Sequence, residues 1–202
     1  MDPEVEDWDQ DPRGMLKVYQ QQSYKLGESV ADLIDNSYDA NAKRIEVNIG
    51  LDPETAELYI RILDDGDGIS EKSWKGMMTL GAQKKRPKTE LGIYGVGMKL
   101  SSLSQADEVT IASVNKGRFG LRRISANYIK SSGRNKLMVT STESAAYKES
   151  YEKMIDGKWS TMLLLESIHS ERKFSSLSSK RETSINKEIK RIRYLEIDKI
   201  CK

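Results

Sequence analysis

The chain has 202 residues, 37% of them hydrophobic and 32% charged, a composition that fits one folded domain and excludes a chain that is disordered as a whole. The net charge of +2 gives no reason to expect a nucleic-acid or membrane surface over the whole molecule, and the lone cysteine, Cys201, excludes an intramolecular disulfide. No run approaches the ~20 apolar residues that a membrane-spanning helix needs, so we expect a cytoplasmic protein, or a nuclear one if its source is a eukaryote, with no membrane partner.

The N-terminal part of the chain predicts a strap, helices and a hairpin. Residues 1–14 are acidic and contain two prolines, which indicates a flexible strap. From Met15 to Asp39 the apolar residues recur at helical spacing, with a break near Gly27. The spacing then changes to the alternation of a strand on each side of a turn at 52–53. The alternating residues are Ile45, Val47 and Ile49, and then Leu58, Ile60 and Ile62.

The rest of the chain predicts two helices, four strands and a terminal extension. A helix over 71–80 begins at the cap residue Ser70, a loop follows over 81–90, and a second helix follows Gly97. The expected strands, the first two joined by a hairpin turn, cover residues 108–114, 118–127, 136–141 and 161–166. This pattern predicts an α+β fold with the helices on one face of a mainly antiparallel sheet. Residues 171–202 indicate a serine- and charge-rich linker and an amphipathic helix.

A first group of polar residues lies on the helix that ends near residue 39. Asp32, Asn36 and Asp39 are spaced four and three apart, so they share one helix face. An amide oxygen can ligate magnesium, which prefers oxygen ligands and completes its octahedron with phosphates and water. A carboxylate one turn earlier could deprotonate an attacking water. A solvated helix face that carries ordinary acids is the alternative interpretation.

A second group follows the predicted strand that ends near residue 63, in the run Asp64-Asp65-Gly66-Asp67-Gly68. Its glycines permit positive φ and let a ligand approach the backbone closely. Asp64, at the strand end, could accept a hydrogen bond from an exocyclic amine. A tight polar turn is the alternative. A calcium loop fits poorly, because such a loop lies between helices and ends in a glutamate.

A third group is the run Gly92-Ile93-Tyr94-Gly95-Val96-Gly97-Met98-Lys99, which precedes a predicted helix. Backbone amides at such a turn, together with the helix N-terminus, can bind an anion. The run matches neither a Walker A sequence nor a Rossmann fingerprint. A structural glycine turn would explain it equally well.

The three groups in this order resemble the GHKL ATPases, the superfamily of gyrase, the ninety-kilodalton heat-shock chaperone, histidine kinases and mismatch-repair MutL. The run Asn36-Ser37-Tyr38-Asp39-Ala40 and the residues to Ile45 look like the N-box of MutL-type members, and the run from Gly92 to Lys99 looks closer to the MORC ATPases. The resemblance covers residues 15–170. It implies a Bergerat fold, which is a two-layer sandwich with a mixed, mostly antiparallel sheet, and it implies ATP and Mg²⁺ as ligands.

The resemblance also implies a role for individual residues. Asn36 would ligate magnesium, Asp64 would bind the adenine amino group, and the segment of residues 69–98 would act as a lid over ATP. Thr161 resembles the strand threonine that supports adenine through Asp64, although the usual Gly-Thr pair reads Ser160-Thr161 here. The other residues expected at the nucleotide are Asp39, Gly66, Gly68, Ile69, Gly95, Val96, Gly97, Met98 and Lys99.

Two departures from the family pattern affect the expected activity. The catalytic base of the family is usually glutamate, whereas this chain has Asp32, which is one methylene shorter. Too few residues follow the last predicted strand for the transducer domain that often supplies a lysine to ATP, so the chain would be a fragment or would depend on a partner. We therefore expect a slow magnesium-dependent ATPase that acts as an ATP-gated switch, with an ATP-dependent homodimer and a DNA or protein partner as candidate assemblies.

Two other functions remain open at this point. A nucleotide-sensing module with little turnover would agree with Asp32 and with the missing transducer. A protein serine kinase of the same superfamily is a further alternative, against which the Asn-Ser-Tyr-Asp-Ala run counts. The only histidine, His169, lies at the edge of the predicted linker, which argues against a phospho-accepting histidine kinase.

Overall fold

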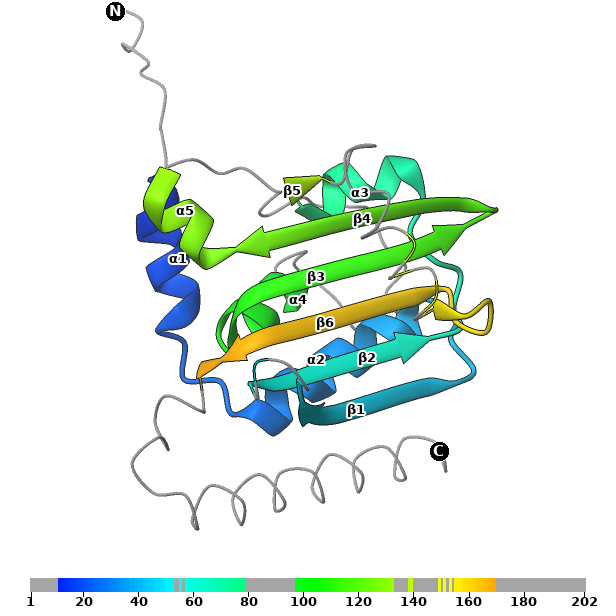
Figure 1. The fold of residues 1–202 in the computed structure, drawn as a ribbon, viewed down its shortest axis with the longest axis horizontal. Helices are drawn as coiled ribbons and strands as arrows, with labels where there is room; N and C mark the ends of the chain where they lie inside the picture. The colour runs from blue at the N-terminus through cyan, green and yellow to red at the C-terminus, as the bar shows by residue number, and fades with distance from the viewer. Residues whose placement is uncertain are drawn as a thin grey trace, which may run out of the picture.

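The computed structural model describes residues 11–52, 55, 57–78, 97–132, 138–139, 149, 151, 153 and 155–169. Within these residues a six-stranded sheet carries helices against one face, which confirms the predicted α+β sandwich (Figure 1). Most of the predicted lid, the linker and the C-terminal helix lie outside the described residues. In the described part, no helix has the length and apolar character needed to cross a membrane.

The N-terminal helices α1 (Pro12–Gln20) and α2 (Leu26–Asp39) are separated at residues 21–25, close to the expected break. Helix α1 begins three residues before Met15, inside the stretch that the sequence predicted as strap. The Asp11 carboxylate accepts hydrogen bonds from the backbone N–H groups of Arg13 and Gly14 at 3.2 and 3.1 Å, and Pro12 occupies the first helical position. This N-cap signal sets the helix start.

The sheet places the last described strand at its centre. Strand order is β1-β2-β6-β3-β4-β5, and every pairing between described strands is antiparallel. The strands are β1 (Ile45–Leu51), β2 (Leu58–Asp64), β3 (Ala106–Asn115), β4 (Arg118–Ser125), β5 (Met138–Val139) and β6 (Thr161–Ile168). Because β6 lies between β2 and β3, Thr161 is the register partner of both Asp64 and Ser113.

The turn between β3 and β4 agrees with the prediction, but the end of β4 does not. Lys116 and Gly117 have φ of 49° and 76°, the left-handed geometry of a two-residue hairpin turn. Strand β4 ends at Ser125, whereas the expected strand continued to Asn127. Helix α5 (Ala126–Ser132), absent from the prediction, begins there because the Ser125 hydroxyl accepts a hydrogen bond from the Tyr128 N–H at 3.1 Å.

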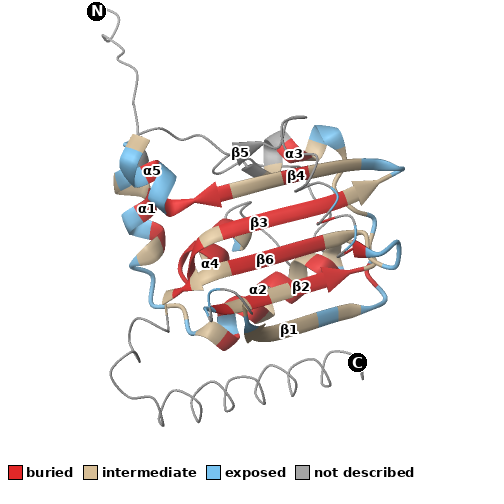
Figure 2. Cartoon of the chain, in the orientation of Figure 1, coloured by how far each residue is buried: buried red, intermediate tan, exposed pale blue. Residues whose placement is uncertain are grey.

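Apolar side chains fill both faces of the sheet, as the buried central strands show (Figure 2). The larger core packs α2 against the helix-facing residues of β2, β3 and β6, and α3 (Glu71–Met78) adds Trp74. Ser70 caps α3 as expected, because its hydroxyl accepts from the Ser73 N–H at 3.2 Å. A smaller core on the opposite face gathers Leu63, Ala112, Leu121, Tyr151, Ile155, Met162 and Leu164.

Helix α4 (Gly97–Leu103) packs against α2 through small side chains. Ser29 of α2 and Ser101 and Ser102 of α4 have no exposed surface. The hydroxyl of Ser29 lies 3.5 Å from that of Ser104, which follows α4. Small residues let two helix backbones approach closely, and α2 and α4 lie side by side behind the centre of the sheet (Figure 1).

Candidate functional site

The centre of the candidate site is the carboxylate of Asp64, at the end of β2. Its side chain is only 5% exposed and faces α2. Oδ2 accepts from the Ser37 hydroxyl at 3.1 Å, and Oδ1 accepts from the Gly66 N–H at 3.0 Å and the Ser160 hydroxyl at 3.3 Å. Burial raises the pKa of Asp64, and these hydrogen bonds oppose that rise. A buried carboxylate that accepts these three hydrogen bonds can accept a further one from a ligand.

The loop after Asp64 is pressed against its neighbours. A Cβ added to Gly66 would lie 2.5 Å from the Ala40 carbonyl oxygen, and one added to Gly68 would lie 2.2 Å from that of Val114. Gly68 also has φ of +70°. Both positions therefore require glycine, but of the two only Gly68 has the positive φ that the motif predicted, and the closest atoms belong to Ala40 and Val114.

Ser113 of β3 joins three parts of the site and was missed by the sequence analysis. Its hydroxyl accepts from the Ile69 N–H at 2.9 Å, donates to the Ser160 carbonyl at 2.9 Å and lies 3.1 Å from Thr161 Oγ1. Thr161 thus contacts Ser113, whereas Ser160 supplies the hydrogen bond to Asp64 from this side of the sheet. A polar residue within an apolar strand pattern was the one available signal.

Helix α2 brings Asp32 and Asn36 to the same region. Asn36 Nδ2 donates to the backbone carbonyl of Asp32 at 2.8 Å, which leaves the amide oxygen as the atom that can ligate a cation. Asp32 Oδ2 accepts from the hydroxyl of Ser101 at 2.9 Å. Asn36 is adjacent in sequence to Ser37, the hydrogen-bond partner of Asp64, so the first two motifs meet here. Asp39 is half-buried and lies at the end of the same helix.

The third motif is only partly described, since Gly95 and Val96 lie outside the described residues. Gly97 is exposed at the start of α4, and Met98 packs against the larger core. Lys99 is 5% exposed, and its ammonium donates to the Met77 carbonyl near the end of α3. Burial lowers the pKa of Lys99 to about 8. The predicted phosphate-binding lysine is thus held by a backbone carbonyl.

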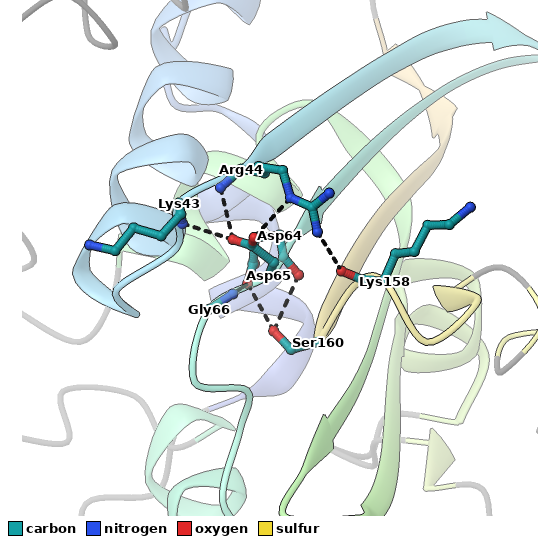
Figure 3. A network of polar contacts seen from close by, with 7 residues as sticks. All are labelled: Lys43, Arg44, Asp64, Asp65, Gly66, Lys158 and Ser160. Carbon is teal, nitrogen blue, oxygen red and sulfur yellow. Dashed lines mark hydrogen bonds and ion pairs between the residues drawn. The ribbon is translucent and has the colours of Figure 1, made fainter.

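Asp65 has a different role from its neighbour Asp64 (Figure 3). It accepts from the backbone N–H groups of Lys43 and Arg44 at 2.7 and 2.8 Å and from Arg44 Nε at 3.0 Å. These contacts, above all the Arg44 N–H, lower the pKa of Asp65 to about 2. The Arg44 guanidinium also lies over Trp159, 5.4 Å from the ring centroid. Asp65 therefore fixes the turn, whereas Asp64 accepts hydrogen bonds from Ser37, Gly66 and Ser160.

A cavity of about 370 Å³ opens beside this turn and shares only Ser160 with the hydrogen-bond partners of Asp64. Asp65, Val114, Trp159 and Ser160 are among its lining residues, and Val114 and Trp159 belong to the core on the face away from α2. None of Asp32, Asn36, Asp64 and Lys99 lines it. The polar contacts around Asp64, and not this cavity, therefore define the candidate site.

The residues present fit ATP with magnesium better than a metal held by protein alone. Among the described residues no group of three His, Cys, Asp or Glu side chains could hold a metal ion. Magnesium commonly takes one or two protein oxygens and completes its shell with phosphate oxygens and water, which the Asn36 amide oxygen would allow. The buried acceptor of Asp64 suits the amine of a nucleotide base, and the buried cation of Lys99 suits its phosphates.

Comparison with known proteins gives an independent result. A family model described as histidine kinase-, DNA gyrase B-, and HSP90-like ATPase matches residues 24–158. MORC family CW-type zinc finger protein 1 of the mouse is 37% identical over 79 residues, which are 37% of this chain and 8% of that protein. Protein MICRORCHIDIA 3 of Arabidopsis thaliana is 27% identical over 139 residues, which are 64% of this chain and 23% of that protein. The chain therefore spans less than a quarter of either relative.

Proposed function

The chain belongs to the histidine kinase-, DNA gyrase B- and HSP90-like ATPase family, with relatives of the MORC type, and from that membership we propose that it binds ATP with magnesium and hydrolyses it. The observation that supports this most directly is the buried carboxylate of Asp64. It lies between helix α2 and a loop whose glycines leave no room for side chains.

In the proposed complex, each motif holds a different part of the nucleotide. Asp64 accepts a hydrogen bond from the adenine amine, and the base lies against the backbone of Gly66, Gly68 and Ile69, with Thr161 and Asp39 at its border. Asn36 holds magnesium through Oδ1, and the metal, when bound, neutralises phosphate charge. The residues at the phosphates are Gly95, Val96, Gly97, Met98 and Lys99.

Hydrolysis would use Asp32 as the general base. Its carboxylate takes a proton from a water molecule whose oxygen attacks the γ-phosphorus. The bond from that phosphorus to the β,γ-bridging oxygen breaks, and the products are ADP and inorganic phosphate. Since aspartate is shorter than the usual glutamate of this family, we expect slow turnover.

Nucleotide binding would also change the contact between α3 and α4. Met77 lies within the predicted lid and Lys99 directly follows it, so their hydrogen bond connects α3 to α4, which residues 79–96 separate in the sequence. Phosphate oxygens compete with the Met77 carbonyl for the same ammonium group. We propose that this exchange reorders residues 69–98 and that, within a domain of residues 15–170, the reordered lid supports an ATP-dependent homodimer.

Phosphate release and light scattering together test this function. We expect phosphate release from ATP with magnesium, none with excess EDTA, and a doubled mass in a non-hydrolysable ATP analogue. Analogue binding without phosphate release would instead favour a nucleotide-sensing module, which the short Asp32 side chain also fits. Failure to bind the analogue at all would contradict the proposal.

The pKa of Lys99 predicts that ATP affinity falls above about pH 8. The pKa is lowered to about 8 in the free protein, so at higher pH the neutral lysine must take up a proton before it can contact phosphate. Affinity should fall by up to about tenfold per pH unit, with proton uptake on binding. Calorimetry at pH 7, 8 and 9 in buffers of different ionisation enthalpy measures the ATP affinity and the proton uptake.

Lys99→Arg is the matched variant, because arginine stays charged throughout this range. Its ATP affinity should change little between pH 7 and pH 9. Equal pH dependence in Lys99→Arg and the wild type would show that another group causes it.

A further inference from the structure

The side chain of Ser101 departs from the usual behaviour of a serine inside a helix. Helical serines commonly donate to a carbonyl three or four residues earlier, and Ser104, directly after α4, makes the same contact with the Ser101 carbonyl at 3.1 Å. Ser101 has no exposed surface, yet its hydroxyl donates across the helix interface to Asp32 Oδ2 at 2.9 Å. The contact joins residues 69 positions apart in the sequence.

The position of Ser101 on α4 gives this contact a functional meaning. Lys99, two residues earlier, is the predicted phosphate contact. Helix α4 also begins where the predicted lid ends in the sequence. The serine packing between α2 and α4 leaves a hydroxyl within reach of the carboxylate. One short helix therefore carries both the cation that would contact phosphate and the donor that fixes the proposed base.

We propose that Ser101 is a positioning residue that holds the Asp32 carboxylate through Oδ2, leaves Oδ1 for the attacking water, and makes the orientation of the base depend on helix α4. This inference rests on the proposed function. Aspartate has one methylene less than glutamate with which to adjust its reach, and a misplacement of about 1 Å can cost about 100-fold in rate. A fixed orientation therefore matters more for Asp32 than for a longer side chain.

Ser102 provides a matched control on the same helix. It is also fully buried, but its hydroxyl has no hydrogen-bond partner among the described residues, so Ser102→Ala removes an equal volume without touching Asp32. For Ser101→Ala we expect kcat to fall about tenfold, with an unchanged Kd for a non-hydrolysable ATP analogue. Ser102→Ala should keep the wild-type kcat and the wild-type Kd for the analogue.

A double-mutant cycle in nucleotide-free protein supplies a readout besides activity. Ser101→Ala and Asp32→Ala should couple by about tenfold in the unfolding equilibrium constant, because either substitution alone already removes the part-buried hydrogen bond to a charged group. Ser102→Ala should be additive with Asp32→Ala.

The outcomes separate this inference from the proposed function. Additive effects of Ser101→Ala and Asp32→Ala, or a kcat for Ser101→Ala equal to that of Ser102→Ala, would overturn the positioning role. Wild-type protein that binds the analogue but releases no phosphate would overturn hydrolysis and, with it, the catalytic part of the inference. Coupling together with a selective loss of kcat supports it.

Discussion

Replacing Asp32 with asparagine is expected to slow ATP hydrolysis by about 100-fold or more, because the amide cannot accept the proton of the attacking water. ATP binding should stay unchanged for two structural reasons. Asn36 contacts residue 32 through its backbone carbonyl, which the substitution retains. The Ser101 hydroxyl can donate to the amide oxygen as it does to Asp32 Oδ2. Single-turnover phosphate release and calorimetry with a non-hydrolysable analogue measure the two effects.

Asp32→Glu tests the length of the side chain at position 32 separately from its charge. This variant restores the residue that the family usually has at this position, so it should retain turnover that Asp32→Asn loses. A rate for Asp32→Asn equal to the wild-type rate would remove Asp32 from the chemistry. It would then favour a module that reports nucleotide occupancy.

Local sequence signals predicted most of the elements of the fold. The alternation around Ile60 and Ile62 located β2, and the helical spacing of Val30, Leu33 and Ile34 located the buried face of α2. Helix α5 was missed because it follows β4 without a turn, and its one signal is the cap at Ser125. The start of α1 was missed for a similar reason, since Asp11 and Pro12 fit both a strap and a helix cap.

The backbone of the candidate site was predictable where one residue type satisfies a local backbone need. Gly66 and Gly68 are such positions, because close approach to another backbone excludes a side chain. The hydroxyl partners of Asp64 could not be predicted in this way. Ser37 and Ser160 lie 27 and 96 positions from Asp64, and only the placement of β6 beside β2 brings Ser160 near.

Lys99 shows a different limit of sequence reasoning. Its motif predicts a lysine that faces phosphates, whereas the structure buries it against the Met77 carbonyl. Both can hold if the lysine exchanges partners when nucleotide binds. The phosphate contact of Lys99 stays a prediction, and its partner in the free protein depends on how α3 meets α4.

Asp64→Asn is expected to lower ATP affinity by about 100-fold, because the charged acceptor for the adenine amine is replaced by a group that presents a donor on one side. The fold should tolerate the change. The amide oxygen can accept from the Gly66 N–H in place of Oδ1, and the Ser37 hydroxyl can accept from the new N–H group that replaces Oδ2. Calorimetric titration with ATP measures the affinity.

The direction of the Asp64 pKa makes stability an internal control for this prediction. Burial raises the pKa of the folded carboxyl above its unfolded value, so stability falls as pH rises through that interval, and the ionised group destabilises the fold at neutral pH. Asp64→Asn should therefore unfold at the same or a higher temperature at pH 7. Asp67→Asn removes an exposed carboxylate from the same loop and should keep ATP affinity. If Asp64→Asn bound ATP as tightly as Asp67→Asn, this carboxylate would not be the adenine contact, and the nucleotide site would have to be assigned elsewhere.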